Sequence, residues 1–268
     1  MLQILNVCNN SLKSFITIKL LTMKILIFIL SIFIITGCTK DGGAADTNAA
    51  SSIGKGGSLA RFTIVSNFLY LVDDLTLKIF DITDPVNASP KGSISLRFGV
   101  ETIFPYNDKL FIGSRDGMYI YSITNPASPS LLGEARHTRS CDPVVANDSI
   151  AFVTLRGNQP CGPAEDGLYI YNIKNITSPV ALTKVRMPTP NGIGLQDSLL
   201  YVCQKQNGMR IYNVSNPSAP VLRKTLTTFA FEDVICYNNL LVCYTSRGLA
   251  LYDISVRSNP VFLSEVAN

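Results

Sequence analysis

Apolar and variable positions alternate in five short segments along the chain, and each segment centres on an aromatic residue. Such alternation is typical of a β-strand whose two faces differ. The segments begin at Thr76, Gly117, Gly167, Gly208 and Gly248, at spacings of 41, 50, 41 and 40 residues. A fixed period near 40 residues predicts repeated supersecondary units, each of which needs its neighbours to bury its faces.

Further strand-like runs flank each of these segments. Runs such as Leu110–Ile112 come before the glycine, and Asn or Asp pairs such as Asn107-Asp108 precede them. These pairs tolerate the left-handed backbone of a tight hairpin. After the segment, Asn125–Pro129 is expected to turn the chain into a fourth strand at Ser130–Arg136.

Four strands per period, repeated radially, predict the blade of a β-propeller. The fold class is therefore all-β: a five-bladed β-propeller of four-stranded antiparallel blades. The predicted blades cover residues 58–98, 99–138, 139–188, 189–229 and 230–267.

Three phrases resemble the LVIVD-repeat proteins: Asp81-Ile-Thr-Asp-Pro85, Leu168-Tyr-Ile-Tyr-Asn-Ile173 and Ser140-Cys-Asp-Pro-Val-Val145. The resemblance covers residues 58–268. It implies a propeller in a bacterial protein that is secreted or lipid-anchored, and it implies no settled activity. The chain departs from the pattern at Thr76, which lacks the glycine, and at Val256-Arg257, which replaces Asn-Pro.

The first 38 residues differ from the rest of the chain. They hold three lysines and no acid, and Lys24 precedes an apolar run of 11 residues, Ile25–Ile35, that only Ser31 interrupts. A secretory signal peptide has this organisation, whereas a bilayer span takes about 20 residues. Residues 1–38 are therefore predicted to be a signal peptide, with Met23 as a better start than Met1.

Ile35-Thr36-Gly37-Cys38 resembles the bacterial lipobox, where a signal peptidase cleaves before a lipid-modified cysteine. The resemblance implies membrane attachment through lipid on Cys38. The alternative is an ordinary secretory signal or a short anchor helix in which Cys38 is incidental. Residues 39–57 are small, polar and glycine-rich, and are predicted to be a flexible linker. Thr39 lacks the aspartate that retains many lipoproteins in the inner membrane, so we expect the outer membrane, on either face.

The balance of charge argues against a nucleic-acid partner. Without residues 1–38 the chain holds 20 basic and 19 acidic residues, and no Lys/Arg run is present to neutralise a phosphate backbone. The single histidine, His137, excludes a histidine-based zinc site, and no Gly-x-Ser-x-Gly elbow accompanies it. No cofactor or metal is predicted. His137 and Arg139 are either exposed loop residues or part of a rim that contacts ligand.

Repeated aromatics and cysteines have structural interpretations. One aromatic per blade recurs at Phe80, Tyr121, Tyr171, Tyr212 and Tyr252. The repetition favours packing between blades over a ring-binding surface. Cys203 and Cys243 hold equivalent strand positions and are expected to be buried. Cys161 lies in the insertion at residues 157–166, and an oxidising compartment permits a disulfide with Cys141; two free thiols are the alternative.

The innermost strands supply the candidate ligand site. The register of the repeats places Arg61, Asp142 and Glu232 at equivalent strand starts, with Glu101, Asn191 and Asp233 beside them. If the ring closes, these six side chains can converge on one polar opening of the channel. Convergent carboxylates can bind a cation or act as an acid/base pair. The structural alternative is that they satisfy one another and the strand ends.

These features favour a monomeric, non-enzymatic, lipid-anchored module of the cell envelope that binds a protein or glycan partner. The alternative is a glycoside hydrolase or lyase that uses the carboxylates at the channel mouth. Such enzymes need three carboxylates in the channel and usually aromatics that stack on sugars, and this chain has no tryptophan.

Overall fold

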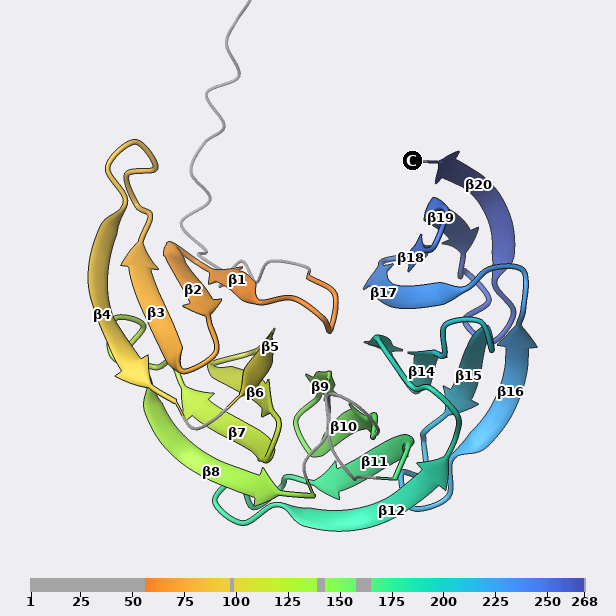
Figure 1. The fold of residues 1–268 in the computed structure, drawn as a ribbon, viewed down its shortest axis with the longest axis horizontal. Coiled ribbons are helices and arrows are strands. Elements are labelled where there is room, and N and C mark those ends of the chain that lie inside the picture. The colour runs from red at the N-terminus through yellow and green to blue at the C-terminus, as the bar shows by residue number, and fades with distance from the viewer. Residues whose placement is uncertain (1–55, 97–98, 139–142, 158–164, 268) are drawn as a thin grey trace, which may run out of the picture. The chain divides into compact units, whose positions relative to one another are not determined.

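The computed structural model describes residues 56–96, 99–138, 143–157 and 165–267. Residues 50–268 form a compact unit of their own. Its described part consists of five four-stranded antiparallel sheets, the blades, around a common axis (Figure 1). In every blade the strands follow chain order from the axis outward. The predicted all-β, five-bladed propeller is confirmed.

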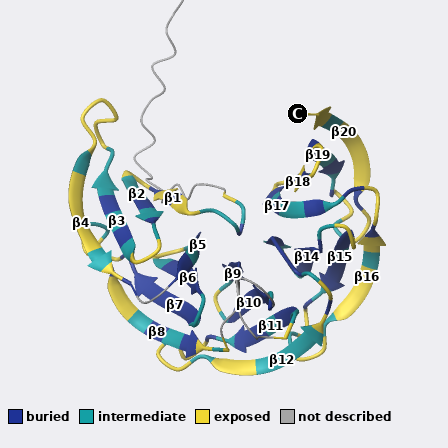
Figure 2. Ribbon diagram, in the orientation of Figure 1, coloured by how far each residue is buried: buried dark blue, intermediate teal, exposed yellow. Residues whose placement is uncertain are grey.

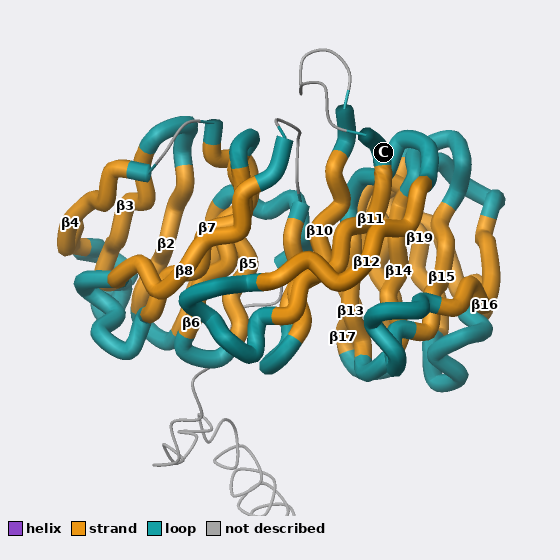
Figure 3. The backbone as a smooth tube through the Cα atoms, turned by 90° about the horizontal axis from the view of Figure 1, so that it is seen from below, coloured by secondary structure: helices purple, strands orange, loops and turns teal. Residues whose placement is uncertain are grey.

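The strands alternate with loops that gather at the two ends of the unit (Figure 3). Within the described ranges, no helix is long and apolar enough to cross a bilayer. The strands are, in blade 1, β1 (Phe62–Val65), β2 (Phe68–Val72), β3 (Thr76–Asp81) and β4 (Ser89–Ser95); in blade 2, β5 (Val100–Tyr106), β6 (Lys109–Ser114), β7 (Gly117–Ser122) and β8 (Ser130–Arg136); in blade 3, β9 (Val144–Ala146), β10 (Ile150–Leu155), β11 (Gly167–Asn172) and β12 (Val180–Arg186); in blade 4, β13 (Ile193–Gln196), β14 (Leu199–Cys203), β15 (Met209–Asn213) and β16 (Val221–Leu226); in blade 5, β17 (Phe231–Tyr237), β18 (Leu240–Thr245), β19 (Gly248–Asp253) and β20 (Val261–Ala267).

Turn chemistry explains where the inner hairpins form. Asn107, Asp197 and Asn238 adopt φ of 51°, 55° and 53°, the left-handed backbone that the Asn/Asp pairs predict. Gly208 has φ of +86°, and a Cβ there would lie 2.1 Å from the carbonyl oxygen of Leu226. Glycine therefore opens this repeat because the third and fourth strands approach too closely for a side chain.

A register shift marks the same place in every blade. It lies between the third and fourth strands, immediately before the repeated aromatic residue: between Ile79 and Phe80, Ile120 and Tyr121, Ile170 and Tyr171, Ile211 and Tyr212, and Leu251 and Tyr252. Such an irregularity bends the outer strand and increases its twist.

Four apolar layers between consecutive blades make up the core. The layer between blades 1 and 2, for example, packs Tyr70 and Ile79 of blade 1 against Leu110, Ile112 and Tyr121 of blade 2. In the same way the other repeated tyrosines are buried between blades, with 2–7% of their surface exposed. The predicted packing role is thus confirmed for the four tyrosines, whereas Phe80 of blade 1 is outside these layers. Cys203 and Cys243 are fully buried in the layer between blades 4 and 5, as expected.

The ring is open between its first and last blades. Figure 1 shows blades 1 to 5 side by side in chain order, and a gap between β1–β4 and β17–β20. The four apolar layers join consecutive blades. Among the described strands, none of blade 1 packs extensively against one of blade 5. Phe80 faces this gap and is only half-buried, unlike its four tyrosine counterparts. The repeat pattern predicts the number of blades but not this opening between the first and the last.

Candidate functional site

Near the axis, where the innermost strands begin, polar side chains of three blades form a chain of contacts. Asn191, with 4% of its surface exposed, donates from Nδ2 to the Oε2 of Glu232 at 2.7 Å. Its Oδ1 accepts from Arg156 Nη1, also at 2.7 Å. Lys205 Nζ lies 3.8 Å from Glu232 Oε2. The side-chain amide of Asn191 thus lies between the positive Arg156 and the negative Glu232, and Lys205 balances Glu232 on the other side.

Asp233 points away from this chain of contacts and binds the segment that leads into blade 1. Its Oδ1 accepts from Ser58 Oγ at 3.0 Å and from Val234 N at 2.9 Å, and its Oδ2 accepts from Leu59 N at 3.2 Å. Burial raises the pKa of Asp233 above its ordinary value, and the three donors oppose that shift. This carboxyl therefore accepts three hydrogen bonds inside the folded unit.

The turn at Gly57–Ala60, which we call the axial turn, ties four blades together. Ser58 is 1% exposed, and its Oγ also accepts from Ile193 N of blade 4 at 2.7 Å. The carbonyl of Ala60 accepts from Ile103 N of blade 2, and the carbonyl of Arg61 from Val72 N of blade 1. Together with the bonds to Asp233 of blade 5, these contacts hold the inner end of the open ring.

The remaining predicted mouth residues have other partners. Glu101 accepts from Arg115 Nε at 3.0 Å within blade 2. The exposed Arg61 donates from Nη2 to the carbonyl of Val100 at 3.4 Å. The structure thus brings Asn191 and Glu232 together but gives Glu101, Arg61 and Asp233 separate environments. The ligand-binding role of all these residues stays a prediction.

Several predicted residues lie outside the described ranges: Cys38, Arg139, Cys141, Asp142 and Cys161. The disulfide between Cys141 and Cys161 therefore stays a prediction. His137 is described: its Nδ1 lies 2.8 Å from the carbonyl oxygen of Thr138 in an exposed loop.

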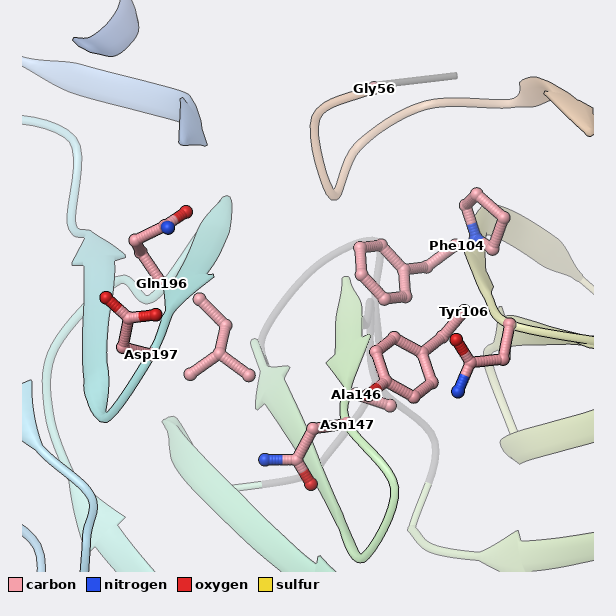
Figure 4. Close-up of a pocket in the computed structure, with 10 residues that line it drawn as sticks. Gly56, Phe104, Tyr106, Ala146, Asn147, Gln196 and Asp197 are labelled. Atoms are coloured by element: carbon pink, nitrogen blue, oxygen red, sulfur yellow. The ribbon is translucent and has the colours of Figure 1, made fainter. Parts of the chain in front are cut away.

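A pocket of about 380 Å³ opens at the opposite end of the axis, where the inner strands end (Figure 4). The rings of Phe104 and Tyr106 point into it from β5 (Figure 4). Around them lie the remaining lining residues: Gly56, Pro105, Asn107, Ala146, Asn147, Leu195, Gln196 and Asp197.

The pocket combines aromatic faces with neutral amides. Asn107, Asn147 and Gln196 supply three amide groups, and Asp197 supplies the one carboxylate among the described residues that line the pocket. Arg257 Nε donates to Asp197 Oδ2 at 3.0 Å and balances that charge. Burial first, and the neighbouring Asp148 second, raises the pKa of Tyr106, so its hydroxyl stays protonated.

The Asn/Asp pairs of the sequence also mark this pocket, but on their own they indicate only turns. Asn107, Asn147 and Asp197 belong to the pairs that predict hairpins, and two of them do adopt left-handed φ. Because these turns end neighbouring inner strands, their side chains and the preceding aromatics meet at one end of the axis.

Comparison with known families agrees with this architecture. The profile of the LVIVD repeat matches residues 192–228, which span blade 4 from β13 to β16. Blade 4 thus carries an LVIVD repeat, within a chain that folds as a five-bladed β-propeller. No curated protein matches its sequence.

Solved structures match this LVIVD-repeat protein at the level of fold. A protein from Lactobacillus plantarum matches with a TM-score of 0.58 at 11% identity, over 75% of this chain and 68% of its own. A functionally unknown protein from Desulfotomaculum acetoxidans matches with a TM-score of 0.58 at 14% identity, over 76% of this chain and 67% of its own. BamB from Moraxella catarrhalis matches with a TM-score of 0.52 at 10% identity, over 69% of this chain and 54% of its own.

Proposed function

We propose that this LVIVD-repeat protein is a non-enzymatic binding module, anchored in the cell envelope through lipid on Cys38, that takes a glycan in the pocket at Phe104 and Tyr106. The pocket carries the proposal, because two aromatic rings and three amides converge there at the end of the axis. A concave site with apolar walls and a few polar groups is the usual form of a small-ligand site.

The pocket's chemistry favours hydroxyl-bearing ligands over charged ones. Amide groups both donate and accept, as sugar hydroxyls do. Asn147 Oδ1 already accepts from Ser149 N and Ile150 N, and Asn107 Nδ2 donates to Asp148 Oδ1, so Asn147 offers its Nδ2 as a donor and Asn107 its Oδ1 as an acceptor. An aromatic face packs against the C–H face of a pyranose ring and excludes water from it. No Lys or Arg is among the described residues that line the pocket, so nothing there favours a phosphate or carboxylate ligand.

The arrangement of acids gives no support to the glycoside hydrolase alternative. Retaining enzymes hold two carboxyl groups about 5–5.5 Å apart, and inverting enzymes about 6.5–9.5 Å, on either side of the scissile bond. Here Glu101 pairs with Arg115, Glu232 contacts Asn191, and Asp233 is held beneath the axial turn. The described acids are thus engaged in separate structural contacts.

We expect Phe104→Ala and Tyr106→Ala each to weaken glycan binding by about tenfold, since losing one stacked ring removes roughly 1.4 kcal/mol. The full-length chain in detergent would be screened on an array of bacterial envelope glycans, and the affinity for each bound glycan measured by calorimetry. Tyr237→Ala is the matched control, because this exposed tyrosine of blade 5 does not line the pocket. Glycan binding that survives both pocket substitutions, or a ligand of this pocket that proves to be a protein, would contradict the glycan proposal.

We also expect Cys38→Ala to abolish lipid attachment and leave the protein unprocessed or soluble. The motive is the lipobox-like Ile35-Thr36-Gly37-Cys38 after the apolar run. Metabolic labelling with a fatty acid and fractionation of membranes measure the effect. Separation of inner from outer membrane tests the outer-membrane location that Thr39 leads us to expect. Normal membrane retention of the variant, or processing that resists globomycin, would refute the anchor.

A further inference from the structure

The face of blade 1 that looks into the ring's opening is apolar and exposed. Phe62 is 60% exposed and Ile64 39%, and cross-strand pairing puts Leu71 and Leu69 beside them. In blade 2 the corresponding positions hold Ile103, Leu110 and Ile112, each at most 1% exposed because blade 1 covers them. Blade 1 therefore presents half of an inter-blade layer that lacks its other half.

The facing side of blade 5 is apolar and exposed as well. Tyr244 is 52% exposed, Tyr237 52%, Leu249 40% and Val266 57%. Val242 and Leu251 on the same side are half-buried. The residues of blade 2 that match Leu249, Val242 and Leu251 are Met118, Phe111 and Ile120, all at 0% because blade 3 covers them. We call these two uncovered faces together the seam; β1 and β17, which lie on either side of it, carry exposed and intermediate residues coloured yellow and teal in Figure 2.

The axial turn fixes the inner end of the seam. Ser58 and Leu59 bind Asp233 of blade 5 while their own chain continues into β1. Ser58 is almost completely buried, so this link is part of the folded unit and not a surface contact. The two apolar faces are thus held on either side of one opening.

The chain's own repeats show what fits such an opening. Blades 2, 3 and 4 each pack one apolar face against the blade before them and the other against the blade after them. The central hairpin of blade 2, β6–β7, is buried on both faces: every strand residue except Lys109 is buried, and the turn residues Arg115 and Asp116 are half-buried. Terminal repeats usually end in a polar outer face, and neither terminal blade does so here.

Two occupants other than a partner protein, a second copy and the chain's own residues 39–55, fit the opening poorly. A second copy has two free faces, one on each terminal blade, but the axial turn holds them on either side of that copy's own opening. One inserted terminal blade brings a single free face, because its other face packs on its own neighbour, and so leaves half of the seam uncovered. Residues 39–55 are small and polar and cannot supply two apolar faces. The two structures with a TM-score of 0.58 extend beyond the match, which covers 68% and 67% of their chains, so this blade arrangement also occurs in larger folds.

We propose that the seam is a docking site for a β-hairpin of a partner protein, one that carries apolar side chains on both faces and completes the ring as an additional blade. The inter-blade packing that the chain repeats four times continues into this site. This interface is separate from the pocket at Phe104 and does not depend on it.

The probe is a synthetic peptide of residues 109–122, which is the β6–β7 hairpin and has the required two apolar faces. We expect fluorescence anisotropy to show saturable binding of this peptide to the full-length chain in detergent. Phe62→Lys and Tyr244→Lys should each weaken binding by about tenfold or more, as loss of a central apolar anchor does. Both residues are more than half exposed, so these variants should fold normally.

The matched control is Leu131→Lys, on the outer strand of blade 2 and 52% exposed, which should leave the peptide's affinity within about twofold. Absence of saturable binding, or equal loss in the control and seam variants, would overturn the proposal.

Thiol labelling separates the other occupants. Ile64→Cys and Leu249→Cys should react with a maleimide beyond the level of the wild-type chain, and the peptide should protect both. Protection without peptide would mean that the chain's own residues cover the seam. A disulfide between the two introduced thiols in the double variant would mean that the ring closes on itself. Either result would overturn the proposal.

Discussion

Asp233→Ala is expected to lower the free energy of unfolding by about 2–4 kcal/mol, since each buried donor left without a partner costs about 1–3 kcal/mol. The substitution removes the acceptor for Ser58 Oγ, Leu59 N and Val234 N. Because Ser58 is 1% exposed, water replaces the lost bond poorly. Denaturant unfolding of the full-length chain, followed by tyrosine fluorescence, measures the change.

The loss should also appear at the far end of the contact. Without Asp233 the axial turn loses its bonds to blade 5, so hydrogen exchange at Ile193, whose amide binds Ser58 Oγ, should accelerate. Asp253→Ala on β19 of the same blade is the matched control, because this exposed carboxylate binds only its local turn at Ser255. Similar melting temperatures for the two variants would show that the axial turn contributes little.

The sequence predicts the blades because each strand depends on neighbours close in the chain. The period of the glycine segments, the Asn/Asp turns and the alternation of apolar positions are local signals, and Ser130–Arg136 is indeed β8. The open seam is not local. Phe62 and Tyr244 follow the same alternation as their buried counterparts, and only the spatial arrangement shows that nothing in the described chain covers them.

The candidate site divides in the same way. Register within the repeats brings Asn191 and Glu232 together, since equivalent positions on neighbouring inner strands lie side by side. The bond from Ser58 to Asp233 joins residues 175 positions apart, and no repeat relates them. The pocket was not predicted, for another reason. Asn107 and Asp197 adopt the left-handed backbone of a tight turn, and this alone explains why Asn and Asp occur there, so their side chains give no separate indication of a binding site.

These observations explain how an open ring can hold its shape. Four apolar layers fix consecutive blades, while the first and last blades are joined through a short polar link at the axis. This link needs a close approach of backbone to the carboxylate of Asp233. Gly57 and Gly192 provide the space, because a Cβ on either would lie 2.1 or 2.2 Å from an oxygen of Asp233.

Gly192→Ala should therefore destabilise the protein by about 3 kcal/mol, at the upper end of the range for overpacking. A Cβ at this position would lie 2.2 Å from Asp233 Oδ1 and 2.6 Å from Asp233 Cα. The side chain cannot rotate away without losing Ser58 and Leu59, and the Cα moves only if β17 shifts. Denaturant unfolding gives the free energy, and accelerated exchange at Ile193 would locate the damage at the axial turn.

Gly92→Ala on the exposed outer strand of blade 1 is the control, because a Cβ there meets no atom within 4 Å. Alanine suits a strand better than glycine, so this control should raise stability by about 0.5–1 kcal/mol. The two alanines thus have opposite expected signs, and intrinsic strand preference alone would make both stabilising. A Gly192→Ala protein as stable as the wild type would show that β17 can move away from β13, and that the axial link tolerates a wider ring.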